Sequence, residues 1–442
     1  MEQTRIIPPG GGDPNDRTQA MADVGKTAMV GAVRALEMDV IAGNRYVLSN
    51  EPSRDHVMLQ LRSSASMMGR RLPLNIALVI DRSGSMEGEP LDYVKRACGY
   101  VVDLLDQNDI LSVVTFEEQV DVIMPARRVV NKTLIKEHIN RIEPGNTTNL
   151  YDGIVVGANQ VASAVSAGCV NRVLLFSDGD PTAGIKDFGS IVGQVAEQKS
   201  RGITVTALGF GPDYNEELIA GIARQSGGNY YYISRPDLIP EVFRRELESL
   251  MTIIARDMKL RLNLSRWVQL RQVYGRKPSF SGRSAEVPLV DMERGSAMSV
   301  LCEMEFAPRP AGTYRVAKAE LFYEDTSSGR SETIAADIEF DFTSDRALVQ
   351  ANVNPIIAQE IEIAQASRNL EKTVMGMKTQ QLSAMTATME LQKTMSLLAS
   401  QGRTDEAEDV RKAIESIQQG GPGAEKTLIG TIYSLDQGKR KE

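Results

Sequence analysis

The fold class of this 442-residue chain is set by Leu74-Asn75-Ile76-Ala77-Leu78-Val79-Ile80-Asp81-Arg82-Ser83-Gly84-Ser85. Residues 74–80 form a near-continuous apolar run, which is typical of a parallel strand that is buried on both faces. The run ends at a carboxylate, Asp81, and two hydroxyls follow it at alternating positions, on Ser83 and Ser85. Gly84 lets the backbone turn tightly between them. The stretch therefore predicts a buried strand with a polar turn at its carboxyl end.

Downstream of this strand, segments of strand and helix character alternate as far as residue 255. Further strands are expected at 110–116, 173–176, 203–208 and 230–233, and helices at 90–105, 134–142, 150–165, 188–200, 216–225 and 239–255. Such alternation implies βαβ units with right-handed crossovers. We therefore assign residues 73–255 to an α/β domain with a doubly wound, mostly parallel sheet that is covered by helices on both faces.

Two β-rich segments flank the α/β domain. Residues 31–72 contain short strands separated by a turn, and residues 256–345 alternate with period two in several stretches. Segments of this kind form antiparallel β-sandwiches. We expect 31–72 to complete the sandwich formed by 256–345, so that the α/β domain is an insertion between its two halves.

The remaining segments are a helical region and two tails. Residues 350–418 carry apolar residues at spacings of three and four, which predicts helices with one apolar face. A methionine stripe in this region is interpreted as core packing rather than as a partner surface: Met385, Met389 and Met395. Residues 1–30 are rich in Gly, Pro, Asp, Asn and Thr, which predicts a disordered tail. Residues 419–442 begin with glycines and a proline and end in basic residues, so we expect a flexible tail.

Composition argues against several classes of function. The net charge of −8, from 50 basic and 58 acidic residues, argues against nucleic-acid binding, and no apolar run is long enough to span a membrane. The first residues lack the layout of a secretory signal. Three scattered cysteines predict buried free thiols in a reducing compartment, so we expect a cytoplasmic protein: Cys98, Cys169 and Cys302.

The scarcity of histidine argues against catalysis. Only His56 and His138 occur in the chain, and neither falls near the polar turns, so no histidine is available there as a general base. A phosphate-binding GxxxxGK[ST] loop is also absent from the sequence. We therefore expect no enzymatic activity, and a hydrolase that uses a metal to activate water is disfavoured.

Two more polar loops fall at the same end of the predicted sheet as Asp81. The strand 173–176 ends in Ser177-Asp178-Gly179, and the loop 144–150 contains adjacent threonines, Thr147 and Thr148. Acidic residues often cap turns, which would explain either acidic turn alone but not the agreement of three loops. Oxygen ligands without histidine or cysteine favour a hard cation, Mg2+ before Mn2+ or Ca2+, over zinc. The nearby acids Glu87 and Asp180 are interpreted as solvated.

These residues resemble the metal-ion-dependent adhesion site of von Willebrand factor A domains. The match consists of Asp81-x-Ser83-x-Ser85, a threonine before Asn-Leu at Thr148, and Asp178-Gly179. The neighbouring stretches resemble bacterial members related to inter-alpha-trypsin inhibitor heavy chains: Leu74–Met86, Asn149–Gly153 and Arg172–Gly179. The resemblance is strong over about 73–250 and weaker in the flanking segments.

The resemblance implies how the site would bind its ion. The hydroxyls of Ser83, Ser85 and Thr148 would contact the metal, while Asp81 and Asp178 would act directly or through water. An Asp or Glu of a protein partner would fill the vacant position through a charge-assisted contact. The sequence therefore predicts a metal-dependent protein-binding module.

An alternative function comes from the N-terminal segment. Thr18 and Thr27 each precede an apolar residue by three positions, which is similar to bacterial phosphothreonine sites that forkhead-associated domains bind. The resemblance to von Willebrand factor A domains implies the same alternative, a regulatory or scaffold subunit of a bacterial ATPase or Ser/Thr kinase and forkhead-associated signalling system. Short motifs of this kind also occur by chance in polar tails.

Overall fold

The computed structural model describes residues 34–64, 71–164, 168–177, 180–210, 215–233, 235–419 and 423–441. The segment 1–30, with Thr18 and Thr27, lies outside these residues, as does Asp178.

A six-stranded sheet forms the centre of the α/β domain. Its strands are β4 (Leu74–Asp81), β5 (Ile110–Phe116), β6 (Val120–Arg128), β7 (Val170–Ser177), β8 (Thr204–Phe210) and β9 (Tyr230–Ile233). They follow the order β6-β5-β4-β7-β8-β9, and all neighbours are parallel except β5 and β6. The winding direction reverses at β4, which has β5 on one side and β7 on the other. An open α/β sheet binds ligands where its winding reverses, so the fold directs attention to the end of β4 at Asp81.

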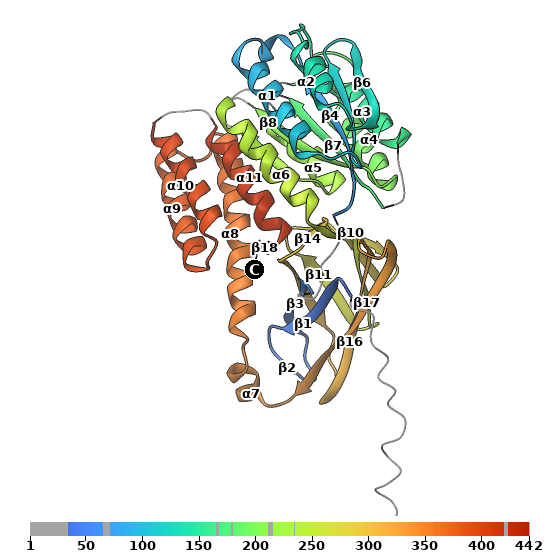
Figure 1. The fold of residues 1–442 in the computed structure, drawn as a ribbon. Helices are drawn as coiled ribbons and strands as arrows, with labels where there is room; N and C mark the ends of the chain where they lie inside the picture. Colours follow the sequence, from blue (N-terminus) through green and yellow to red (C-terminus); the bar gives the residue numbers. More distant parts are fainter. Residues whose placement is uncertain are drawn as a thin grey trace, which may run out of the picture. The chain divides into compact units, whose positions relative to one another are not determined.

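Helices cover both faces of this sheet (Figure 1). They are α1 (Glu89–Leu104), α2 (Lys132–Asn140), α3 (Leu150–Ser163), α4 (Phe188–Ser200), α5 (Glu216–Ser226) and α6 (Ile239–Met251), with short 3-10 turns η2 (Gly84–Met86) and η3 (Pro236–Leu238). Every residue of β4 is buried, and its side chains alternate between two cores. Ile76 and Leu78 pack with α1, α2 and α6, whereas Ala77 and Val79 pack with α3, α4 and α5. The apolar run therefore becomes a strand that is covered on both sides.

Two further sheets share one buried core. Their strands are β1 (Leu36–Ala42), β2 (Tyr46–Leu48), β3 (Ser53–Ser63), β10 (Ile253–Leu264), β11 (Val268–Val273), β12 (Ser279–Ser281), β13 (Ser284–Pro288), β14 (Met292–Glu293), β15 (Ser296–Phe306), β16 (Gly312–Asp325), β17 (Arg330–Thr343) and β18 (Lys439–Lys441). One sheet has the order β1-β3-β15-β11, the other β12-β13-β10-β16-β17-β2. Strand β3 precedes the α/β domain and pairs antiparallel with β15, which follows it. The α/β domain is thus inserted between strands of the same two sheets.

The C-terminal region is helical and extends further than the sequence pattern predicted. It comprises α7 (Arg346–Ala351), α8 (Pro355–Lys378), α9 (Ala384–Ser400), α10 (Thr404–Gln418) and α11 (Ala424–Gln437). The prediction of a flexible tail over 419–442 is wrong, because α11 buries Leu428 and Ile432 in the helical core and Tyr433 in a core of the α/β domain. Strand β18 then pairs with β15. Residues 420–422 and 442 lie outside the description.

The methionine stripe of α9 is only partly a packing stripe. The buried face of this helix consists of Ala387, Leu391, Thr394 and Leu398. Met395 packs partly against that core. Met385 and Met389 are 77% and 51% exposed, so the prediction of core packing is wrong for these two residues. They fall on the outer side because the buried positions repeat at spacings of four, three and four.

Two predictions from composition have structural counterparts. Cys98, Cys169 and Cys302 are free and buried, as expected. No helix in the part of the chain that the structure describes is long and apolar enough to cross a membrane.

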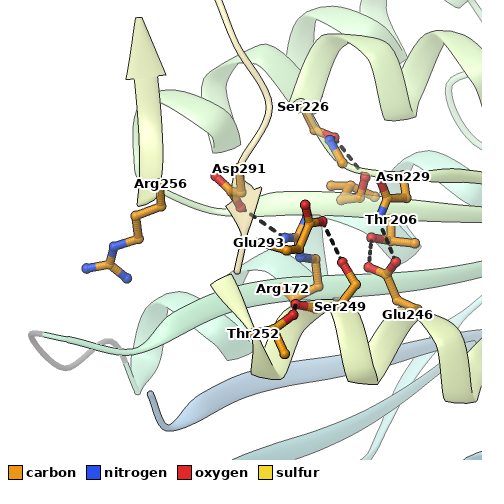
Figure 2. A network of polar contacts seen from close by, with 12 residues as sticks. Arg172, Thr206, Ser226, Asn229, Glu246, Ser249, Thr252, Arg256, Asp291 and Glu293 are labelled. Carbon is orange, nitrogen blue, oxygen red and sulfur yellow. Dashed lines mark hydrogen bonds and ion pairs between the residues drawn. The ribbon is translucent and has the colours of Figure 1, made fainter. Parts of the chain in front are cut away.

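A polar network lies in the amino-terminal half of the six-stranded sheet and extends to Asp291 and to Glu293 of β14 (Figure 2). The Glu246 carboxylate of α6 is 1% exposed and accepts hydrogen bonds from Thr206 Oγ1 (2.5 Å), Asn229 Nδ2 (2.7 Å) and Tyr231 OH (2.9 Å). Beside it, Arg172 Nη2 of β7 donates to Asp291 Oδ2 at 3.1 Å. Buried charges of this kind are tolerated when partners surround them, so the network joins the α/β domain to the adjoining sheet.

Candidate metal site

The Asp81 carboxylate lies at the carboxyl end of β4 and is fully buried. Its Oδ1 accepts the backbone N–H of Ser83 at 2.9 Å, and its Oδ2 accepts the hydroxyl of Ser177, the last residue of β7, at 2.7 Å. The carboxylate therefore bridges the ends of two neighbouring strands at the point where the winding reverses. This explains its orientation toward the loops rather than toward the core.

The two serines of the first turn present their hydroxyls together. Ser83 Oγ and Ser85 Oγ are 3.2 Å apart, with Ser83 buried and Ser85 exposed. The 3-10 turn η2 begins at Gly84, between them. A Cβ at position 84 would lie 3.6 Å or more from other atoms, so an alanine fits there and the expected need for glycine is not evident. The alternation of serines, rather than the glycine, brings the hydroxyls to one side.

The loop 144–150, called the threonine loop below, is joined to the Asp81–Ser85 turn by backbone hydrogen bonds. Gly145 N–H donates to Arg82 O at 2.5 Å, and Gly84 N–H donates to Asn146 O at 3.4 Å. Thr148 is 3% exposed, and the hydroxyl of Thr147 is buried without a hydrogen-bond partner among the described residues. The structure thus joins the turn that carries Asp81, Ser83 and Ser85 to the loop that carries both threonines, through the backbone of Arg82 and Gly84.

A third loop, which follows β7, is held against Thr148. Thr148 N–H donates to Thr182 Oγ1 at 2.8 Å, and Thr148 O accepts the N–H groups of Thr182 (3.0 Å) and Ala183 (3.2 Å). Gly184 has a positive φ of 65°, and a Cβ there would overlap the Asn149 side chain. No local sequence pattern indicates this pairing, because it depends on the approach of two loops 34 residues apart. Asp180, at the start of the loop, is exposed, as is Glu87 in the first turn.

The chemistry of the described groups fits a hard cation. The groups that meet here offer hydroxyl and carboxylate oxygens, which Mg2+ and Ca2+ prefer. Within the described ranges no three His, Cys, Asp or Glu side chains lie close enough to hold a metal ion. His56 lies on β3, where its Nε2 is 3.1 Å from Tyr274 OH, and His138 lies on α2. Neither histidine is placed in the three loops.

Comparison with known proteins identifies the domain. Residues 75–245 match the family model of the von Willebrand factor type A domain, and this part of the chain is such a domain. The family consists of metal-dependent adhesion and protein-interaction modules, which are typically non-enzymatic.

The relatives include bacterial and animal proteins. An uncharacterized protein of Synechocystis sp. is 27% identical over 296 residues, which cover 64% of this chain and 69% of that protein. Human inter-alpha-trypsin inhibitor heavy chain H4 is 27% identical over 167 residues, which cover 36% of this chain and 18% of the heavy chain. The chain thus spans under a fifth of the heavy chain, and the predicted similarity to this group is confirmed for the von Willebrand factor A domain.

A solved structure supports the fold beyond that domain. The von Willebrand factor type A protein from Catenulispora acidiphila has a TM-score of 0.72 at 18% identity and covers 86% of this chain and 89% of its own. At this identity the likeness concerns the fold alone. The combination of an α/β domain with flanking sheets and C-terminal helices therefore recurs in a solved structure.

Proposed function

We propose that the von Willebrand factor A domain binds Mg2+ and captures a protein partner through it. The ion is held by the hydroxyls of Ser83, Ser85 and Thr148, with Asp81 and Asp178 acting directly or through water. The observation that carries this proposal is the pair of serine hydroxyls, 3.2 Å apart, beside the buried Asp81 carboxylate. A buried carboxylate next to converging hydroxyls is favourable when a cation shares the site.

A partner carboxylate is the expected additional ligand. Both oxygens of Asp81 already accept hydrogen bonds within the chain, from Ser83 N–H and from the Ser177 hydroxyl. Its negative charge is therefore partly shared with these donors. A divalent ion held mainly by neutral hydroxyls still gains from an anionic ligand, and an Asp or Glu of a partner supplies one.

Binding rather than turnover is the proposed outcome. A metal-dependent hydrolase needs a group that activates or delivers a proton near the ion. His56 is engaged with Tyr274, and no histidine belongs to the loops around Asp81. We therefore propose a non-enzymatic module. The three buried free thiols support a reducing, cytoplasmic setting for it.

Calorimetric titration of the full chain with Mg2+, Mn2+ and Ca2+ tests which ion binds. Capture of partners from a lysate, with Mg2+ or with chelator, tests whether partner binding depends on the ion. Asp81→Ala is expected to weaken Mg2+ binding by at least about 100-fold and to abolish Mg2+-dependent capture. Asp180→Asn is the matched control, because it removes an exposed acid at the start of the adjoining loop. Equal Mg2+ affinity in wild type and Asp81→Ala, or the same captured proteins with and without chelator, contradicts the proposal.

A further inference from the structure

Arg82 immediately follows Asp81 and brings a positive charge next to the metal-site turn. Its side chain is 18% exposed, and Arg82 Nη2 is 3.1 Å from both Glu117 Oε1 and Asp121 Oδ2. An unpaired guanidinium at this position would repel a divalent cation. The two acids therefore compensate a charge that lies beside the proposed ion.

Glu117 differs from Asp121 in what else it contacts. Its second carboxylate oxygen, Oε2, accepts the N–H of Asn146 at 3.0 Å, and its backbone carbonyl accepts the N–H of Asn149 at 2.7 Å. Asn146 and Asn149 flank the two threonines. The Glu117 side chain, directly after β5, thus binds Arg82 through one carboxylate oxygen and the threonine loop through the other.

The threonine loop closely fits this carboxylate. A Cβ at Gly145 would lie 2.8 Å from Glu117 Cδ and closer still to the carboxylate oxygen, so only glycine allows the approach. Gly145 also donates its N–H to Arg82 O at 2.5 Å. The loop is therefore held from two sides, by the Arg82 backbone and by the Glu117 carboxylate.

We propose that Glu117, with Arg82, is the positioning pair of the metal site. Glu117 holds the loop of Thr147 and Thr148 against the Asp81–Ser85 turn, so that hydroxyls from both loops face one ion. It also neutralises Arg82, but that task is shared with Asp121. The expected effect on Mg2+ affinity rests on the proposed function, whereas the expected effect on the order of the threonine loop does not.

Three variants separate positioning from charge. Glu117→Ala removes both contacts, Glu117→Gln removes the charge and keeps an acceptor for Asn146, and Asp121→Asn removes an equal charge without touching the threonine loop. We expect Glu117→Ala to weaken Mg2+ binding by about 10- to 100-fold, the range seen when groups that orient metal ligands are removed. Glu117→Gln should fall between Glu117→Ala and wild type, and Asp121→Asn should stay within about threefold of wild type, because a half-exposed ion pair contributes little.

A second readout needs no metal. Hydrogen exchange of the amides of residues 145–149, measured in chelator, should be faster in Glu117→Ala than in wild type and unchanged in Asp121→Asn. Equal loss of Mg2+ affinity in Glu117→Ala and Asp121→Asn, or exchange in Glu117→Ala equal to wild type, overturns the positioning role. If wild type binds no Mg2+, the proposed function fails, and the exchange comparison still decides whether Glu117 positions the loop.

Discussion

Two buried polar groups at opposite ends of the six-stranded sheet, the Glu246 carboxylate and the Thr147 hydroxyl, differ in their hydrogen-bond partners. In the amino-terminal half, the Glu246 carboxylate has three donors from the chain itself, on Thr206, Asn229 and Tyr231. At the carboxyl end, the buried Thr147 hydroxyl has no partner among the described residues. A polar group that the chain satisfies internally stabilises one packed arrangement, whereas an unsatisfied one beside converging hydroxyls is suited to an external ligand. The contrast separates a structural polar network from a candidate binding site on one sheet.

The largest effect is expected from truncating Glu246. Glu246→Ala leaves three donors without their acceptor, the buried Thr206 hydroxyl and the partly buried Asn229 and Tyr231 groups, and a buried group of this kind costs about 1–3 kcal/mol. We expect the α/β domain to lose about 3–5 kcal/mol of unfolding free energy in urea titrations, with or without Mg2+. Glu246→Gln, which keeps the shape and an acceptor, should lose less. A loss below about 1 kcal/mol in Glu246→Ala would show that the network contributes little to stability.

The buried Asp436 carboxylate, which has fewer partners, should make the stability of the chain depend on pH. Asp436 of α11 accepts a hydrogen bond from the Ser367 hydroxyl at 2.9 Å and lies 3.8 Å from Arg224, with Arg276 and Glu371 as further charges nearby. Burial raises its pKa from 3.8 to about 6. The unfolded chain therefore releases this proton first, and the Asp436 contribution to stability falls as pH rises from about 4 to about 6.

The shift corresponds to a decrease of up to about 3 kcal/mol over that window. Asp436→Asn should remove this pH-dependent component. The unfolding free energy of the variant should therefore rise relative to that of wild type as pH rises from 4 to 7. Urea titrations at several pH values measure it. A difference that does not depend on pH would show that folding leaves the pKa of Asp436 unchanged, which contradicts the raised value.

The sequence pattern located the centre of the sheet better than its edges. The central strand at Asp81 was predicted from its apolar run, because a central parallel strand is covered on both faces. Of the two edge strands, β9 (Tyr230–Ile233) was predicted. Strand β6 was missed, since it is an edge strand with mostly exposed residues and a proline at position 125. Helix α11 was missed because the glycines before it and the basic residues after it outweighed its apolar spacing.

The site could be predicted as residue types but not as a network of contacts. The spacing of Asp81, Ser83 and Ser85 was sufficient to place three oxygen groups in one turn. The contacts of Glu117 with Arg82 and with Asn146 join residues 29 to 35 positions apart, and no local pattern signals them. Such pairings depend on how loops approach each other after the sheet has formed.

Mg2+ should stabilise the domain only through the carboxyl end of the sheet. At about 100 times the dissociation constant, a ligand that binds one folded-state site adds about 2.7 kcal/mol. We expect this gain in wild type and in Glu246→Gln, and none in Asp81→Ala. Thermal or urea unfolding measures it as the difference in stability between samples with Mg2+ and samples with chelator. A gain that persists in Asp81→Ala would place the ion elsewhere and remove the distinction between the two ends.

The smallest change in stability is expected at the threonines, where the choice of ligand is decided. Thr147→Val replaces a buried hydroxyl that has no partner among the described residues by a methyl group of similar shape, so the metal-free stability should change by less than about 0.5 kcal/mol. Thr148→Val keeps the backbone hydrogen bonds to Thr182 and Ala183 and removes the proposed ligand.

The two variants should therefore differ only when Mg2+ is present. A tenfold loss of affinity in Thr148→Val lowers the Mg2+-dependent gain by about 1.4 kcal/mol, whereas Thr147→Val should keep the wild-type gain. The reverse pattern would assign the ligand to Thr147, whose hydroxyl has no partner among the residues that the structure describes. Equal gains in both variants would exclude the threonine loop from metal binding and leave the serine turn to hold the ion without it.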